Sequence, residues 1–120
     1  MPGRWGDEDG YVTVEAAIVF TALTAVIGLV VAGVLTVAAY LGAVGMARDG
    51  ARAAALGDVA AARAVVAERD PEASVAVDSG PLPTGPSGDQ QLFSVRVTVP
   101  GRLFAVSATA VIVGEPQTVR

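Results

Sequence analysis

The chain begins with a short polar segment and then runs through 32 consecutive residues, 16–47, without a charged side chain. Alanine and valine dominate this run. About 20 apolar residues are enough to cross the hydrocarbon core of a bilayer as an α-helix. The pattern therefore predicts a membrane-spanning helix, which we assign with its extension to residues 11–57. Residues 1–10 contain glycine, proline and mixed charge, and we expect them to form an unstructured leader.

The length of the apolar run argues against an ordinary cleaved signal peptide. A signal peptide has an apolar core of about 7–15 residues that follows a basic start. Here the core is longer, and the first ten residues hold only Arg4 against three acidic residues. We therefore expect the apolar helix to stay in the chain.

Helical spacing continues beyond the apolar run. Asp49 and Arg52 stand three residues apart and can pair on one helix face. Gly57 followed by Asp58 is typical of a helix end and the N-cap of the next helix. Residues 59–69 then predict a short second helix with one apolar side, because Val59, Ala62, Val65 and Val66 recur at helical spacing. The Asp70-Pro71 pair ends this helix.

The period of the pattern then changes from 3.6 to two residues, which indicates strands. The expected elements are strands at 74–78, 93–99 and 103–113, a loop at 79–90 rich in glycine and proline, and a turn at 100–101. A small sheet needs a helix on one face, and the apolar side of the second helix is the expected cover. The predicted fold class is α+β: a long N-terminal transmembrane helix, a short second helix, and a small C-terminal antiparallel β-sheet of two to three strands.

Composition excludes several classes of function. The chain has no cysteine and no histidine, so thiolate chemistry, imidazole bases and the usual zinc sites are excluded. Its net charge of −4, without a basic patch, gives no electrostatic support for nucleic-acid binding. The acidic segment 7–9 lacks the glycine-anchored loop of a calcium site. We expect no cofactor, no metal and no enzymatic activity.

Two features of the apolar helix point to contacts with other chains. Glu15 stands where the apolar run begins, and an acidic side chain at the centre of a spanning helix costs about 2.5–3.5 kcal/mol, less toward its ends. Intramembrane charges of this kind usually have a partner and a function. Small residues also recur every four positions, which lets another helix approach closely, although a helix this rich in small residues produces such stripes by chance as well. The stripe comprises Thr24, Gly28, Ala32 and Thr36.

The order of Gly10, Tyr11 and Glu15 before a long apolar helix resembles the processing site of type IV prepilins and pseudopilins. The layout of the whole chain resembles the TadE-like proteins of the tight-adherence (Flp) pilus-assembly system. This resemblance implies a leader at 1–10, cleaved after Gly10 by a prepilin peptidase, and a small extracytoplasmic α+β domain at 58–120. It also implies that Glu15 pairs with the new α-amine of Tyr11 on a neighbouring subunit.

The resemblance implies a structural subunit, a minor pilin or pseudopilin, that crosses the cytoplasmic (inner) membrane once. Its partners would be the prepilin peptidase, other pilin-like subunits, the pilus assembly platform and the lipid bilayer. The arginine count leaves another orientation open. Arg4 precedes the span, whereas Arg48 and Arg52 follow it, and arginines collect on the cytoplasmic side. The alternative is an unprocessed single-pass accessory subunit of a membrane complex, with its sheet in the cytoplasm.

Overall fold

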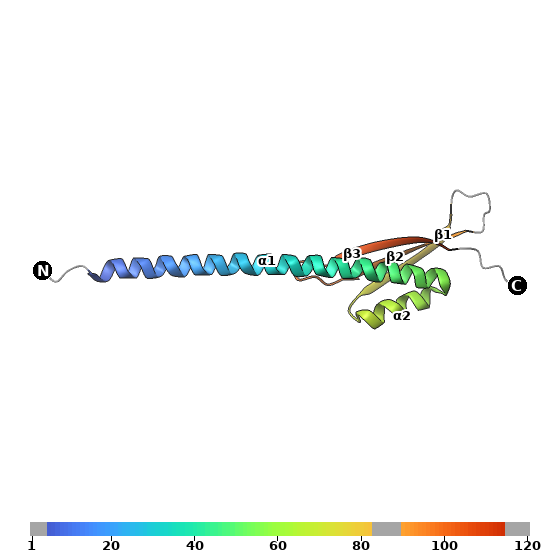
Figure 1. The fold of residues 1–120 in the computed structure, drawn as a ribbon, viewed down its shortest axis with the longest axis horizontal. Helices are drawn as coiled ribbons and strands as arrows, with labels where there is room; N and C mark the ends of the chain where they lie inside the picture. The colour runs from blue at the N-terminus through green and yellow to red at the C-terminus, as the bar shows by residue number, and fades with distance from the viewer. Residues whose placement is uncertain (1–4, 83–89, 115–120) are drawn as a thin grey trace. The chain divides into compact units, whose positions relative to one another are not determined.

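The computed structural model describes residues 5–82 and 90–114 and contains two helices followed by three strands (Figure 1). The elements are α1 (Trp5–Leu56), α2 (Val59–Arg69), β1 (Ser74–Pro81), β2 (Gln91–Val99) and β3 (Val106–Gly114). The predicted α+β class is confirmed, and the sheet has three strands. The chain divides into two units, Met1–Val34 and Leu35–Arg120, and α1 runs through both.

The first helix begins earlier than the sequence indicated. An unstructured leader was expected up to Gly10, but α1 already starts at Trp5, so the expectation was wrong for residues 5–10. Residues 1–4 lie outside the described part. Glu8 and Asp9 fall near the beginning of α1, where carboxylates interact favourably with the positive end of the helix dipole. The acidic residues that we assigned to an irregular leader thus favour a helix.

The boundary between the two helices matches the prediction. The amide of Gly57 donates to the carbonyl of Ala53 at 2.9 Å, just after the last residue of α1. Asp58 then caps α2, because its Oδ1 accepts a hydrogen bond from the amide of Ala61 at 2.8 Å. An N-cap of this kind satisfies an amide that has no partner within the helix.

Asp49 forms an ion pair other than the one that its spacing from Arg52 allows. Asp49 Oδ2 instead lies 2.9 Å from Nη1 of Arg69, in the last turn of α2. The chain reverses at Gly57 and Asp58, which brings the end of α2 back beside α1. Sequence spacing shows only neighbours on the same helix, so it could not reveal this pair.

The sheet is an antiparallel meander with the strand order β1-β2-β3. β1 extends to Pro81, which pairs with Gln91, so the predicted strand 74–78 was too short. β3 begins only at Val106, because Val99 pairs with Val106 and the intervening residues form a loop. The expected strand start at residue 103 was therefore wrong. Of the predicted loop at 79–90, residues 83–89 lie outside the described part.

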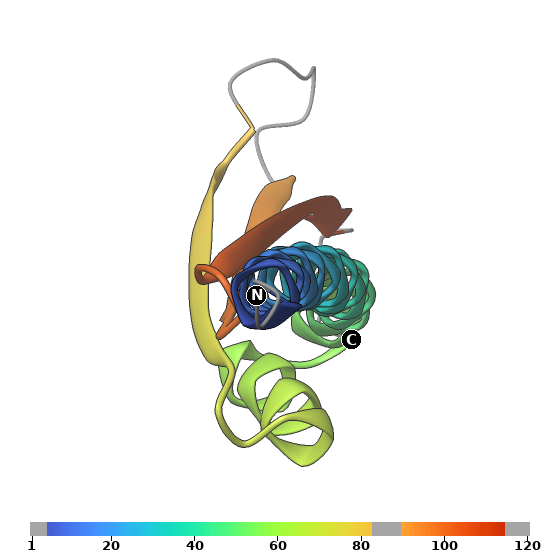
Figure 2. The same ribbon diagram turned by 90° about the vertical axis from the view of Figure 1, so that its left-hand side faces the viewer.

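One face of the sheet packs against helix, as the alternation in β2 predicted. Val95, Val97 and Val99 are buried on this face. The predicted cover was α2 alone, whereas the core also includes the C-terminal part of α1. Figure 2 shows the strands curving beside α1, with α2 on another side. The buried helix residues are Ala43, Met46, Ala47, Ala51 and Ala54 from α1 and Ala62 and Val66 from α2.

Gly50 shows why the covering face of α1 consists of small residues. A Cβ atom at this position would lie 3.2 Å from Cγ1 of Val95 and 3.5 Å from Cγ2 of Val66. The first distance is tighter than ordinary van der Waals contact, so β2 and α2 approach α1 as closely as a glycine permits. Small residues on α1 thus determine how closely β2 and α2 pack against it.

Candidate processing and assembly site

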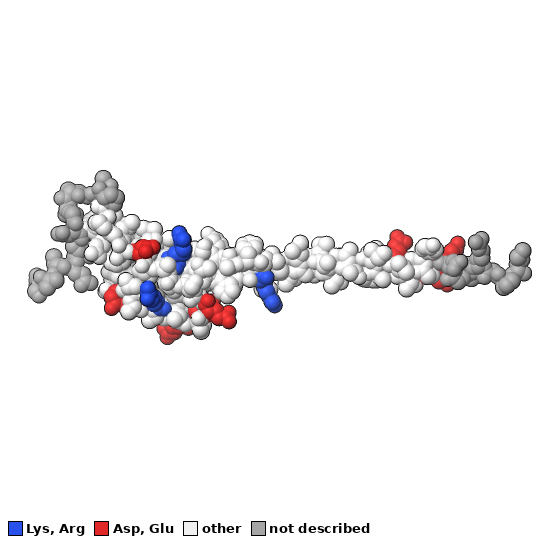
Figure 3. Space-filling view, turned by 180° about the vertical axis from the view of Figure 1, so that it is seen from behind, with Lys and Arg blue, Asp and Glu red and all other residues white. Residues whose placement is uncertain are grey.

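The N-terminal unit is a helix that exposes apolar side chains on all sides. Tyr11, at its start, is 78% exposed, and Val34, at its end, is 64% exposed. The helix segment Glu8–Leu56 is long and apolar enough to cross a membrane. Figure 3 shows one face of the molecule, on which a long stretch of α1 carries neither red nor blue atoms. A helix that is apolar all round suits a lipid environment, and none of the described residues of this unit covers its side chains.

The polar side chains in this unit are partly satisfied by the helix itself. The hydroxyl of Thr13 donates to the carbonyl of Asp9 at 2.8 Å, and that of Thr21 donates to the carbonyl of Ala17 at 2.7 Å. Hydrogen bonds to the carbonyl four residues earlier remove the cost of placing a hydroxyl in a medium without water. These threonines are therefore compatible with a membrane span.

The predicted cleavage point between Gly10 and Tyr11 lies inside α1. Gly10 does not have a positive φ angle, and a Cβ atom there would meet no atom within 4 Å. Neither backbone conformation nor packing within the described chain requires glycine at this position, as is also true of Gly28 and Gly42. Glycine lowers helix stability by about 1 kcal/mol relative to alanine. A peptidase that needs an extended segment would open the helix more easily at such a residue.

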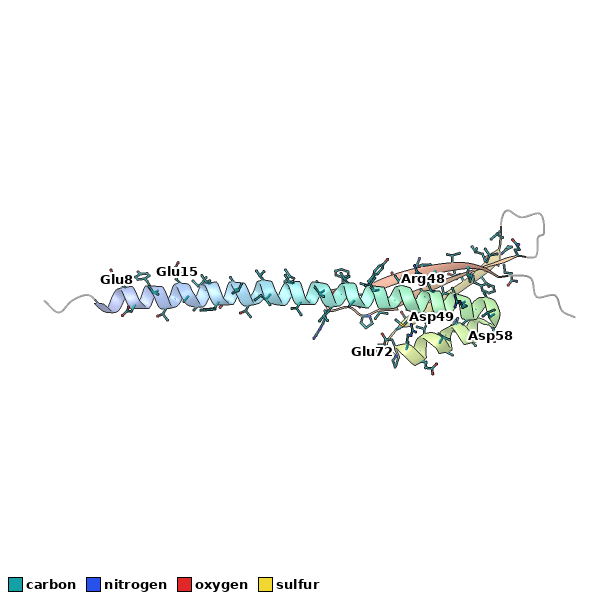
Figure 4. All side chains as sticks on the ribbon, in the orientation of Figure 1. Glu8, Glu15, Arg48, Asp49, Asp58 and Glu72 are labelled. Carbon is teal, nitrogen blue, oxygen red and sulfur yellow. The ribbon has the colours of Figure 1, made fainter. Side chains whose placement is uncertain are left out.

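Glu15 is exposed on α1, and none of the described residues forms a hydrogen bond or ion pair with its carboxylate. Figure 4 shows Glu8 and Glu15 on the same side of the helix, as expected for residues seven apart. The nearest described arginine in the sequence is Arg48, 33 residues later. Any partner of Glu15 therefore comes from outside the described residues, and a second subunit is one source.

The stripe of small residues falls into two parts. Thr24 and Gly28 are exposed and Ala32 is half-buried, so this part remains accessible. Thr36 is only 5% exposed, and its Oγ1 accepts a hydrogen bond from the amide of Leu103 at 3.4 Å. The packing role predicted for the first part remains a prediction. Thr36 is in contact with the loop between β2 and β3 of its own chain.

Sequence reasoning missed the continuation of the stripe into the C-terminal unit. After Thr36, small residues recur at intervals of three or four positions and are half-buried or buried. They are Ala39, Ala43, Ala47, Gly50 and Ala54. Extending the search for helical spacing beyond the apolar run would have found this face, because the spacing does not change at the first charged residue.

Comparisons with protein-family models, curated proteins and solved structures found no match. The function is therefore inferred from the chain itself. The chain contains a long N-terminal apolar helix packed on a small antiparallel sheet, with a carboxylate at the start of the apolar run. This layout is consistent with a pilin-like fold.

Proposed function

We propose that this protein is a TadE-like minor pilin or pseudopilin of a tight-adherence pilus or a related secretion apparatus. In this proposal α1 holds the chain in the cytoplasmic membrane, a prepilin peptidase removes residues 1–10, and the sheet lies outside the cytoplasm. The role is structural rather than catalytic. The observation that carries the proposal is Glu15, an exposed carboxylate five residues after Gly10 without a partner among the described residues.

Pairing between subunits accounts for the placement of Glu15. Cleavage after Gly10 creates an α-ammonium group on Tyr11, four residues from the carboxylate. Within one helix an amine at the first position and a carboxylate at the fifth would sit one turn apart, but the same two groups on adjacent helices can also meet. An unpaired charge in lipid is strongly disfavoured, so pairing across subunits sets their relative register. The exposed small residues at Thr24 and Gly28 would let the helices approach closely.

Processing is tested by intact mass. The full chain is expressed in membranes with and without a co-expressed prepilin peptidase, and we expect loss of residues 1–10 only when the peptidase is present. Gly10→Val should block the cleavage. Gly42→Val is the matched control, because Gly42 is also a helical glycine with open space around it. An unchanged mass with active peptidase would contradict the proposal.

The pairing of Glu15 has a specific chemical test, because the chain contains no lysine. After cleavage the α-amine of Tyr11 is its only primary amine. A membrane-permeable carbodiimide should therefore link Tyr11 to Glu15, and mass spectrometry can show whether the amide joins two subunits. An amide found only within single chains would contradict pairing between subunits. Glu15→Gln should abolish the product.

The alternative is an unprocessed accessory subunit with its sheet in the cytoplasm, and the positions of Arg48 and Arg52 favour it. A single cysteine at the exposed Ser107 distinguishes the two orientations, since the chain has no cysteine of its own. In intact spheroplasts a membrane-impermeant maleimide should label this cysteine if the sheet is extracytoplasmic. Labelling only after lysis would support the alternative.

A further inference from the structure

The loop between β2 and β3, residues 100–105, is attached to α1 at Thr36. The amide of Leu103 donates to Thr36 Oγ1 at 3.4 Å. A Cβ atom at Gly101 would lie 3.3 Å from Cγ2 of Thr36 and would collide with the carbonyl oxygen of Phe104. Thr36 thus contacts the loop at both Gly101 and Leu103. The loop therefore has a defined position on the helix and does not project freely from the sheet.

The tip of this loop exposes apolar side chains. Leu103 is 49% exposed and Phe104 is 63% exposed, and both follow the exposed Arg102. Within the same unit α1 also exposes large apolar side chains close to Thr36 in the sequence. These are Leu35, Val37, Tyr40 and Leu41. Single exposed apolar residues are common on proteins, but here several lie on two elements that are joined at Thr36.

The position of Thr36 along α1 indicates what that partner is. Thr36 lies 20 residues after Ala16, the first residue of the uncharged run, which corresponds to about 30 Å of helix. This length equals the thickness of the hydrocarbon core of a typical bilayer. Tyr40 follows one turn later, and tyrosine is enriched at the level of the lipid headgroups. The loop is thus attached where a span that starts at Ala16 would leave the hydrocarbon.

We propose that the β2–β3 loop is a second membrane contact, in which Leu103 and Phe104 enter the interfacial layer of the bilayer and Arg102 binds lipid phosphate. The attachment of the loop at Thr36, about one bilayer thickness along α1 from Ala16, favours lipid over a second protein as its occupant. Arg102 has no ion-pair partner among the described residues, and a guanidinium group complements a phosphate in both charge and geometry. Its aliphatic stem can lie along apolar neighbours while its charge reaches the headgroups.

This contact would fix the sheet against the membrane surface in the membrane-resident chain. It requires only that α1 spans the bilayer. It depends neither on cleavage after Gly10 nor on the pairing of Glu15, so it can fail while the proposed function holds, and the reverse is also true.

Lipid-borne quenching tests the proposal on the full chain. Phe104→Cys is labelled with the environment-sensitive fluorophore NBD and reconstituted into vesicles of phosphatidylcholine and phosphatidylglycerol that contain a lipid with a nitroxide near its headgroup. Val113→Cys is the matched control, because Val113 is also an exposed apolar residue but lies near the opposite end of β3. Val26→Cys, within the apolar run, verifies that the helix is inserted.

We expect a blue-shifted emission and its loss on quenching for the label at residue 104, but a water-like, unquenched emission at residue 113. Arg102→Gln should reduce the quenching at residue 104, and more so in vesicles with phosphatidylglycerol than in phosphatidylcholine alone. An unquenched label at 104 beside a blue-shifted label at 26 would overturn the proposal. A label at 104 that is blue-shifted but not quenched would also overturn it, because a protein surface rather than lipid would then cover the loop.

Discussion

The two parts of α1 are built from the same small and aliphatic residues but have different surroundings. In the Met1–Val34 unit the described helix exposes large apolar side chains such as Phe20 and Leu23. In the Leu35–Arg120 unit one face of the same helix is buried against α2 and the sheet, with Gly50 at the closest approach. In the second part, small residues let α2 and the sheet pack against the helix. In the first part, we propose that they let a helix of another subunit approach. Equivalent substitutions in the two parts can separate these purposes.

The largest effect is expected from a charge at an alanine in each part. Ala47→Asp places a carboxylate in the core of the C-terminal unit and should cost about 4 kcal/mol or more, enough to unfold it. Ala25→Asp, at an exposed position, should leave that unit folded but oppose membrane insertion by about 2.5–3.5 kcal/mol. Protease resistance of the C-terminal unit and carbonate extraction of membranes measure the two effects. If both variants failed in the same assay, the distinction between the two parts would be lost.

A smaller effect is expected from enlarging a glycine in each part. Gly50→Val inserts a side chain where a Cβ atom alone approaches Val95 to 3.2 Å, and should lower the free energy of unfolding by about 1–3 kcal/mol. A Cβ atom at Gly28 has no neighbour within 4 Å, so Gly28→Val should not change the free energy of unfolding of the C-terminal unit. Urea unfolding in mild detergent, followed by circular dichroism, gives the comparison.

The glycine pair also sharpens the proposal for the exposed stripe. If Thr24 and Gly28 contact another helix, Gly28→Val should weaken cross-linking between subunits in membranes while leaving the urea midpoint unchanged. A Gly50→Val variant as stable as the wild type would show that β2 is not held this close to α1.

The smallest effect is expected from removing a hydroxyl in each part. Thr36→Val leaves the amide of Leu103 without its acceptor and should cost about 1 kcal/mol. Hydrogen exchange at that amide should become faster, whereas exchange in β3 should change little. Thr24→Val, its counterpart in the stripe, should have no effect on this amide. Unchanged exchange at Leu103 in Thr36→Val would mean that the loop is held by other contacts.

Most of the secondary structure could be predicted from the sequence because it depends on local features. The capping residue Asp58 marks the start of α2, and the alternation around Val95 and Val97 marks the buried face of β2. The errors have local causes too. Apolar residues 103–105 look like the beginning of a strand, but the register of Val99 opposite Val106 excludes them from the sheet.

The residues of the candidate site also differ in whether a local sequence pattern identifies them. Glu15 was identifiable because a carboxylate beside a long uncharged run is unusual wherever it occurs. The accessibility of Gly28 and the burial of Thr36 were not identifiable, although both belong to one stripe with even spacing. Spacing defines the face of a helix on which a residue lies, but it does not show where along the helix another part of the chain covers that face.

The sequence by itself determined a helix long and apolar enough to span a membrane, a second helix and a small antiparallel sheet, since hydrophobic periodicity and capping act over a few residues. Only the tertiary structure decided that Asp49 pairs with Arg69, that β2 and α2 approach α1 most closely at Gly50, and that Leu103 is hydrogen-bonded to Thr36. Each of these contacts joins residues that chain reversal brings together, and the geometry of that reversal is set by packing of the whole unit rather than by any local pattern.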